Sequence, residues 1–187
     1  MKRNAIFIFV FSALLIFLSA ATTSCLPRGR ESAVNLLASP LAWNPENTAL
    51  TVRNVTIPSY VNQSTLVVLK KDGTLASVPG CRLAMPMNES LREALNCELS
   101  ARQGELRNSA PRIISLSLPV FILSEDGTLN IRGMLQIPGE AATRPLKVQS
   151  SIKEGTLNGE RACRLHRLAV NALAAQIIQA LNETGAQ

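Results

Sequence analysis

Few residues of this 187-residue chain could take part in catalysis. It has one histidine, His166, and two aspartates, Asp72 and Asp126, each followed by Gly-Thr. A general base needs a partner within hydrogen-bond reach, and the sequence shows no carboxylate or cysteine partner for His166. An Asp-Gly pair is typical of a tight turn. We therefore predict no enzymatic activity, no metal site and no cofactor, with both aspartates in turns and His166 exposed or half-packed on a helix.

The aromatic content excludes further classes of binding site. Four of the five phenylalanines lie in residues 5–21, so Phe121, Trp43 and Tyr60 are the aromatic residues of the rest. Single-stranded nucleic acids bind to stacked aromatic platforms, which three scattered rings cannot form. The sequence also lacks nucleophile-elbow, zinc-protease, Walker and dinucleotide-binding motifs. These observations favour a protein that acts by contact with a partner.

The N-terminus carries the clearest chemical signal. A basic start, Met1–Asn4, precedes residues 5–21, of which 15 of 17 are apolar, and small residues follow. This order is typical of a secretory signal peptide, whereas a membrane-spanning helix would usually be longer. We predict a signal peptide over residues 1–24.

Cys25 follows the signal directly, and residues 18–25 resemble a bacterial lipoprotein signal, with Thr22 in place of the usual aliphatic residue. The resemblance implies that Cys25 becomes the first mature residue and carries acyl chains such as palmitate, which anchor the chain. Leu26, rather than Asp, follows it, which in lipoproteins of the enteric type implies the outer membrane, with the domain facing the periplasm. The sequence leaves open the inner membrane, and also an ordinary signal with an unmodified cysteine.

Loss of Lys2 and Arg3 with the signal lowers the formal charge from +6 to +4, which is too weakly basic to indicate nucleic-acid binding. Three more cysteines, Cys81, Cys97 and Cys163, would enter an oxidising compartment, where they could form one disulfide and leave one free thiol. The spacing does not identify the pair. Four glycosylation sequons are also present, at Asn54, Asn62, Asn88 and Asn182. They would carry glycans only in a eukaryotic secreted protein.

The distribution of prolines and apolar residues divides the chain after the signal peptide into a tether and a domain, and the domain has two parts. Residues 25–47 contain three prolines and no sustained period, so we predict a tether after the lipid anchor. Residues 48–187 should form one domain. Its first part shows a strand from Leu50 to Ile57, a hairpin of 65–69 and 75–78 around an Asp-Gly turn, and a helix over 88–103 capped by Asn88.

The second part of the domain has the clearest alternation. Apolar and polar residues alternate over 114–122, 129–137 and 146–152, which predicts a three-stranded antiparallel meander with one buried face. Pro119 lacks an amide hydrogen, so its strand should lie at an edge or carry a bulge there. A helix of about 160–183 follows, with Cys163 and Val170 on its apolar stripe. The predicted fold class is α+β, a two-layer domain with an antiparallel sheet and two amphipathic helices packed on it.

Several short motifs carry a family resemblance. The segment 55–61, Val-Thr-Ile-Pro-Ser-Tyr-Val, is similar to the strand ending in Pro-x-Tyr-Leu of the ABC-transport auxiliary lipoproteins of the paraquat-inducible protein C type. The following strand of that family matches Leu66–Val68. Its Arg-Trp-Ala-x-Pro-Leu segment matches residues 82–87 with Leu83 in place of Trp, and a helix follows in register. With the later strands and the terminal helix, the resemblance covers most of residues 50–182.

The resemblance implies a non-catalytic lipoprotein of the periplasm. Such proteins accompany an MCE-domain protein and ABC or inner-membrane components that move lipids between membranes. The expected partners are the membrane, through the N-terminal lipid, these transport components and, left open, further copies of the chain. Pro58, Tyr60 and Val61 are the predicted partner-binding residues, because a tyrosine-bearing loop after a strand suits an interface hot spot.

Two other interpretations remain at this stage. An envelope-assembly or cell-wall-synthase activator lipoprotein would have the same general build. A secreted enzyme or glycoprotein would show glycans or depend on His166 for turnover.

Overall fold

The computed structural model describes residues 49–107, 112–152 and 157–184. The predicted signal peptide (1–24), the tether (25–47) and Cys25 lie outside the described residues. No described helix is long and apolar enough to cross a membrane.

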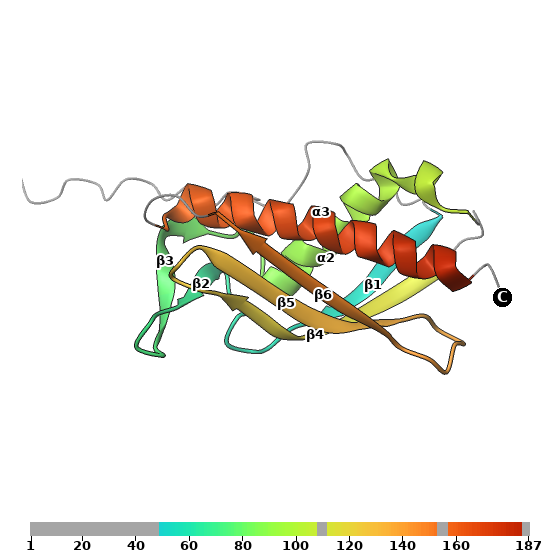
Figure 1. Ribbon diagram of the computed structural model, residues 1–187. Helices are drawn as coiled ribbons and strands as arrows, with labels where there is room; N and C mark the ends of the chain where they lie inside the picture. The colour runs from blue at the N-terminus through green and yellow to red at the C-terminus, as the bar shows by residue number, and fades with distance from the viewer. Residues whose placement is uncertain (1–48, 108–111, 153–156, 185–187) are drawn as a thin grey trace, which may run out of the picture. The chain divides into compact units, whose positions relative to one another are not determined.

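Two helices and six strands make up the described domain, with one short 3₁₀ helix (Figure 1). In chain order they are β1 (Leu50–Thr56), β2 (Thr65–Leu69), β3 (Leu75–Arg82), α2 (Met87–Ala101), η2 (Gln103–Glu105), β4 (Arg112–Leu123), β5 (Thr128–Gln136), β6 (Arg144–Ser151) and α3 (Gly159–Thr184).

The strands form a four-stranded sheet, in the order β1-β4-β5-β6, and a separate hairpin sheet of β2 and β3. The antiparallel meander β4-β5-β6 is confirmed, as is the hairpin. The strand β1 pairs in parallel with β4, from Leu50 opposite Arg112 to Thr56 opposite Ser117. Parallel neighbours require a long connection, which here contains the hairpin and α2.

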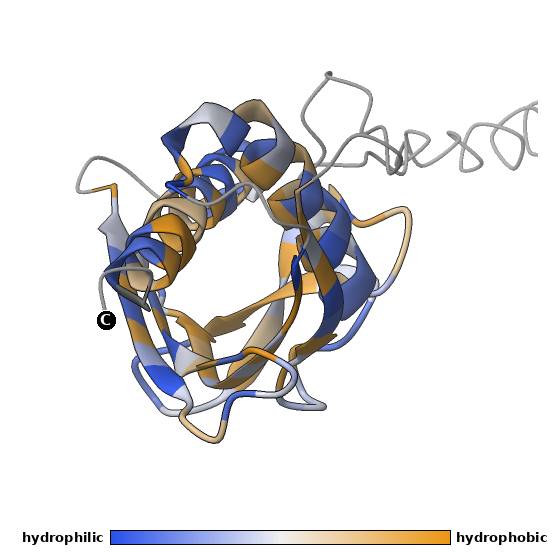
Figure 2. Cartoon of the chain, turned by 90° about the vertical axis from the view of Figure 1, so that its right-hand side faces the viewer, coloured by the Kyte–Doolittle hydropathy of each residue, from blue (hydrophilic) through white to orange (hydrophobic). Residues whose placement is uncertain are grey.

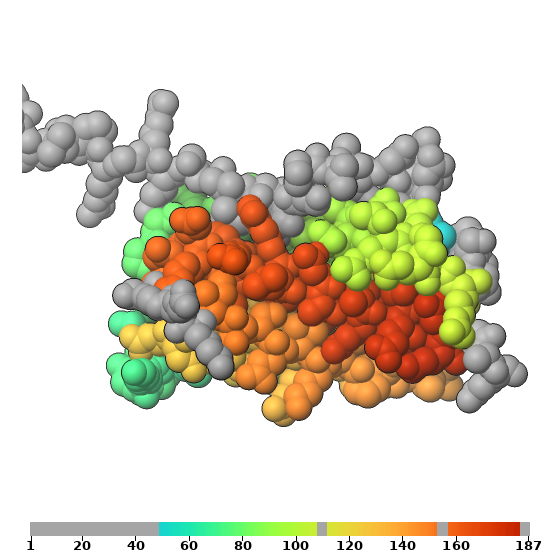
Figure 3. Space-filling view, turned by 45° about the horizontal axis from the view of Figure 1, so that its top comes forward, coloured from blue at the N-terminus to red at the C-terminus, as the bar shows by residue number. Residues whose placement is uncertain are grey.

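Both helices lie on one face of the four-stranded sheet (Figure 1). Helix α2 packs on β1 and against α3, while α3 also contacts β6, β5 and β3. Figure 3 shows α2 and α3 side by side on this face. In Figure 2, apolar and polar residues alternate along the same strands and helices, as two-layer packing requires. The predicted two-layer α+β class is therefore confirmed.

Pro119 lies at a bulge. Strand β4 is interior, and its pairing with β5 shifts register between Ser117 and Val120. The bulge removes the need for an amide hydrogen at Pro119, so one of the two predicted positions for this proline is confirmed.

Helix α2 begins earlier than the sequence suggested. Its N-cap is Pro86, without a side-chain hydrogen bond, so the predicted capping role of Asn88 is wrong. Proline is well suited to a helix start because its φ is already helical and it lacks the amide hydrogen that would have no partner there.

One buried polar side chain joins α2 to the edge strand β1. Asn96 is 2% exposed, and its Oδ1 accepts a hydrogen bond from the Val52 amide at 2.8 Å. Its Nδ2 donates to the Val52 carbonyl at 3.3 Å. The amide of Asn96 thus satisfies the backbone of β1 on the side away from β4, as a neighbouring strand would.

We expect Asn96→Ala to lower the free energy of unfolding by about 2 kcal/mol, because both backbone groups of Val52 would stay buried without partners. Urea denaturation followed by circular dichroism measures the change. Asn88→Ala is the matched control on the same helix, because the Asn88 Oδ1 makes no hydrogen bond. It should change stability by less than about 0.5 kcal/mol, and equal losses in the two variants would contradict the role of Asn96.

Candidate docking site

The loop after β1 is held in a defined turn. The amides of Val61 and Asn62 both donate to the Pro58 carbonyl, at 3.0 and 3.2 Å. The Asn62 Oδ1 accepts a hydrogen bond from the Asn88 amide at 3.2 Å, which attaches the loop to the first turn of α2. This turn exposes Tyr60 (37%) and buries Val61 (4%).

Tyr60 and Val61 line an apolar pocket of about 250 Å³. Its other walls come from the β2–β3 hairpin and from the end of β4. All nine lining residues are uncharged: Tyr60, Val61, Val67, Leu69, Gly73, Leu75, Phe121, Ile122 and Leu123.

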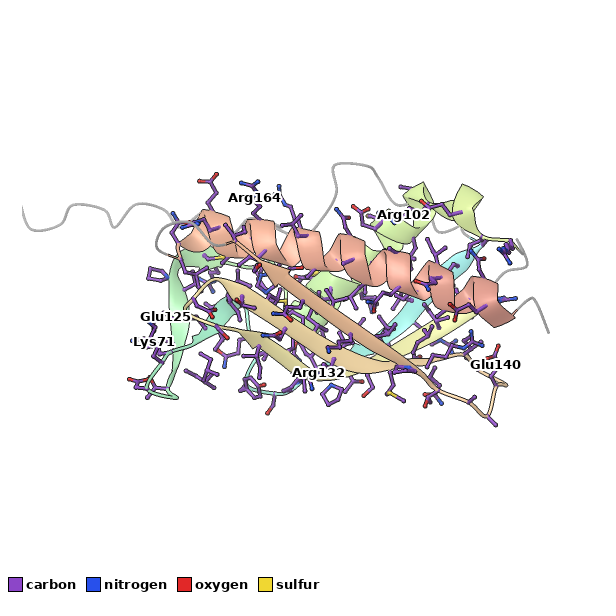
Figure 4. All side chains as sticks on the ribbon, viewed as in Figure 1. Lys71, Arg102, Glu125, Arg132, Glu140 and Arg164 are labelled. Carbon is purple, nitrogen blue, oxygen red and sulfur yellow. The ribbon has the colours of Figure 1, made fainter. Side chains whose placement is uncertain are left out.

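The pocket follows from the way the two sheets meet. The hairpin is hydrogen-bonded to the large sheet where Leu69 bridges to Ser124 and its carbonyl accepts the Glu125 amide at 3.0 Å. The Lys71 amide also donates to the Glu125 carboxylate at 3.2 Å. Figure 4 shows Lys71 and Glu125 close together at this end of the sheet. The hairpin is tied at its turn end, and the pocket lies between it and β4.

The lining of the pocket offers apolar contacts, and its volume limits what could fit there. Pockets for small molecules usually enclose about 300–1,000 Å³, so a lipid with two acyl chains would not fit in this one. One or two apolar side chains of a partner protein would. Leu75 at its rim is 49% exposed, which makes the rim accessible as well as apolar.

The predicted partner-binding residues therefore lie together. Tyr60 and Val61 line the pocket, whereas Pro58 shapes the turn that presents them. Sequence reasoning missed the hairpin and β4 walls. Leu75 was the available signal, because it is an apolar residue directly after the turn. Whether this surface binds a partner stays a prediction.

Other hollows of the described domain are partly charged. One of about 400 Å³ lies between η2 and the end of α3, and Glu105, Arg107 and Glu183 are among its lining residues. Another of about 390 Å³ lies beside the hairpin and includes Lys70 and Asp126. Their charged side chains would lose hydration under an apolar partner, so they are poorer docking sites than the pocket at Tyr60.

His166 is buried, which corrects the prediction of an exposed or half-packed side chain. It is 2% exposed, its Nδ1 lies 2.7 Å from the Ala162 carbonyl oxygen, and its ring lies 5.7 Å from the ring of Phe121. Burial lowers its pKa to about 4, although the hydrogen bond to Ala162 acts in the other direction. The neutral imidazole faces the interior of the domain.

Both aspartates act in turns, as predicted. The Asp72 Oδ1 accepts hydrogen bonds from the Thr74 amide and hydroxyl, at 2.9 and 2.6 Å, and these bonds lower its pKa. The Asp126 Oδ1 accepts one from the Thr128 amide at 3.0 Å. Within the described ranges, no three His, Cys, Asp or Glu side chains lie close enough to hold a metal ion.

The structure brings two of the three described cysteines together. The Sγ atoms of Cys81 in β3 and Cys163 in α3 lie 3.6 Å apart, and both thiols are buried. The hydrogen bond between them lowers the pKa of Cys163 and, with burial, raises that of Cys81. Cys97 lies on α2 and is 9% exposed.

The described residues form a small α+β domain with an uncharged, apolar pocket between the hairpin and β4. Residues 36–178 match the family described as the ABC-type transport auxiliary lipoprotein component. The chain belongs to this family, which confirms the resemblance seen in the sequence.

Solved structures show the same fold. A crystal structure of an uncharacterised protein is 19% identical, with a TM-score of 0.58 over 71% of this chain and 90% of that one. Protein XCC0632 from Xanthomonas campestris, of the family DUF330, is 16% identical, with a TM-score of 0.53 over 80% of this chain and 92% of that one. No curated protein matches the chain significantly.

Proposed function

We propose that this chain is a non-catalytic, lipid-anchored docking component of an MCE- and ABC-type system that moves lipids between membranes. Acylated Cys25 holds it at the outer membrane, and residues 25–47 connect the anchor to the domain on the periplasmic side. The pocket at Tyr60 receives apolar side chains of the MCE-domain partner.

The apolar pocket is the observation that carries this proposal. Its lining is uncharged, its rim exposes Tyr60 and Leu75, and its volume suits side chains better than a whole lipid. Tyrosine is enriched among residues that dominate binding energy, because its ring buries a large area and its hydroxyl tolerates water. Family membership as an auxiliary transport component supports a partner within a transport complex.

We expect Tyr60→Ser combined with Leu75→Asp to reduce the MCE-domain protein recovered with the chain by at least about tenfold, as expected when an interface hot spot is lost. The full-length chain is tagged in its host, crosslinked, purified and quantified by mass spectrometry. Leu168→Asp is the control, because Leu168 is 45% exposed on α3 and is not among the pocket-lining residues.

Equal recovery from the pocket variant and the control would contradict docking through the pocket. Recovery of a cell-wall synthase in place of the MCE-domain protein would favour an activator of envelope synthesis. Both variants should keep the thermal midpoint of the parent within a few degrees, since the substituted side chains are exposed.

The anchor has a separate test. Mass spectrometry of the mature N-terminus should find a diacyl or triacyl group on Cys25. A free amine at another residue, or an intact Met1, would contradict a lipoprotein. Separation of the inner and outer membranes then locates the acylated chain.

A further inference from the structure

Two cysteine thiols of the described domain meet where β3 packs against α3. Cys81 and Cys163 are 82 positions apart in sequence, yet their sulfur atoms lie 3.6 Å apart. The side chains are 5% and 6% exposed, so solvent does not separate them. The Cys163 thiol also donates to the Gly159 carbonyl at 2.7 Å, which fixes the direction of its side chain.

The backbone around the pair is closely packed. A Cβ placed on Gly159 would lie 3.3 Å from the Pro79 carbonyl oxygen and 3.4 Å from the Cys81 Cβ. Glycine at position 159 therefore lets the start of α3 approach β3. Gly80, which precedes Cys81, has a φ of +69°, a conformation that glycine adopts without strain.

We propose that Cys81 and Cys163 form a native disulfide, which fastens the β2–β3 hairpin to α3. A disulfide bond is about 2.05 Å long, so the sulfur atoms need to approach by roughly 1.5 Å. The glycine beside each half of the pair allows this adjustment. Acylation of Cys25 would remove its thiol, and Cys97 is expected to stay outside the disulfide. The cellular part of this inference rests on the proposed periplasmic location.

The oxidation is a thiol–disulfide exchange with a disulfide-bearing oxidant, either an oxidoreductase or oxidised glutathione. One cysteine loses its proton and attacks the oxidant, whose S–S bond breaks as a mixed disulfide forms. The second cysteine then loses its proton and attacks the mixed disulfide. The oxidant leaves as thiols, having accepted two electrons and two protons.

The disulfide would hold one wall of the pocket at Tyr60 in place. The hairpin supplies Val67, Leu69, Gly73 and Leu75 to the pocket wall, while it belongs to a separate two-stranded sheet. Its Leu69 end is already tied to the large sheet through Ser124. A covalent link at Cys81 fixes the opposite end of β3, so both ends of this wall are held in place.

Tryptic mapping without reduction tests the pair directly. The full-length chain is purified in detergent, incubated with oxidised glutathione, and its remaining thiols are alkylated. Cys81 lies on the tryptic peptide 72–82, Cys163 on 162–164 and Cys97 on 93–102. We expect the first two peptides to be linked, with a mass 2 Da below their sum, and the third to be alkylated. Any other linkage, or three alkylated cysteines, would overturn the proposal.

A second sample, acidified and alkylated directly from cells, tests the native state. The linked peptide is expected there as well. If the link forms with glutathione while the cellular sample is alkylated at both cysteines, the native disulfide is overturned and the proposed periplasmic location is contradicted. If Cys81 and Cys163 do not become linked in oxidised glutathione, the proposed disulfide is overturned. The proposed function is then left intact.

Thermal unfolding gives an independent measurement. Reduction of the oxidised parent should lower its thermal midpoint by roughly 5–15 °C, because the crosslink closes a long loop of the unfolded chain. Cys97→Ala should show the same loss on reduction. Cys81→Ala/Cys163→Ala should show none. If reductant leaves the thermal midpoint of the parent unchanged, the disulfide does not stabilise the domain. This outcome would contradict the proposal without relying on any variant.

Discussion

Gly133→Ala is expected to lower the free energy of unfolding by about 4 kcal/mol, a loss at the upper end for a single added methyl group. A Cβ on Gly133 would overlap the Ser117 carbonyl oxygen, and it would lie 2.6 Å from the Leu118 Cδ2. The first of these atoms belongs to the backbone and cannot rotate away. The clash can be relieved only by moving β4 relative to β5 at the centre of the sheet.

The bulge at Pro119 explains why this site is so tight. Where the register of β4 shifts between Ser117 and Val120, the backbone of β4 bends toward Gly133 on β5. Leu118 is fully buried there, so its side chain has little room to yield. A residue without a Cβ is therefore required opposite the bulge.

Urea denaturation compares Gly133→Ala with the control Gly104→Ala. Gly104 lies in η2 and nothing lies within 4 Å of an added Cβ, so that variant should be neutral or gain up to about 1 kcal/mol. A Gly133 variant as stable as the parent would show that the two strands can separate at no cost.

The sequence was most informative where one face of an element is buried. Alternation over 114–122, 129–137 and 146–152 predicted the meander because each of these strands faces helices on one side only. The same alternation does not show which strands are neighbours in the sheet. The apolar residues of β1 show that it is a strand, but its parallel pairing with β4 depends on the path of the chain through the hairpin and α2.

His166 shows the limit of treating a helix as a single stripe. Its neighbours Arg164 and Arg167 are exposed, which suggested a solvated face, and Figure 4 shows Arg164 pointing away from the sheet. Helix α3 nevertheless contacts β3 as well as β5 and β6 of the large sheet, so its buried face is wider than one stripe. The histidine falls on that wider face. Only the tertiary packing reveals this.

Only the part of the candidate site that is contiguous in sequence could be predicted. Tyr60 and Val61 were found from a motif that is contiguous in sequence. The opposite walls come from residues between Val67 and Leu123, which belong to the separate hairpin and to β4 of the large sheet. The cysteine pair likewise joins residues 82 positions apart. No local pattern identifies such contacts, because they are made by the fold as a whole.

We expect the free energy of unfolding of the domain to fall by about 3 kcal/mol between pH 6.5 and pH 4, because His166 is buried as a neutral side chain. Burial lowers the pKa of His166 from 6.5 to about 4. Between these values the unfolded chain binds a proton that the folded chain does not, so acidification favours unfolding. Stability is therefore complete above pH 6.5, falls as the pH decreases and levels off below about pH 4. A tenfold difference in proton affinity between the folded and unfolded chains corresponds to about 1.4 kcal/mol.

Urea denaturation at a series of pH values measures this dependence, and His166→Leu is the matched variant. Leucine fills a similar volume without a titrating group, so the slope between pH 4 and 6.5 should become much shallower even if the variant is less stable throughout. Asp72 does not obscure the result. Its pKa is lowered from 3.8, so its contribution is lost only below that pH. An unchanged slope in His166→Leu would show that another group titrates on folding and that His166 is accessible to protons in the folded domain.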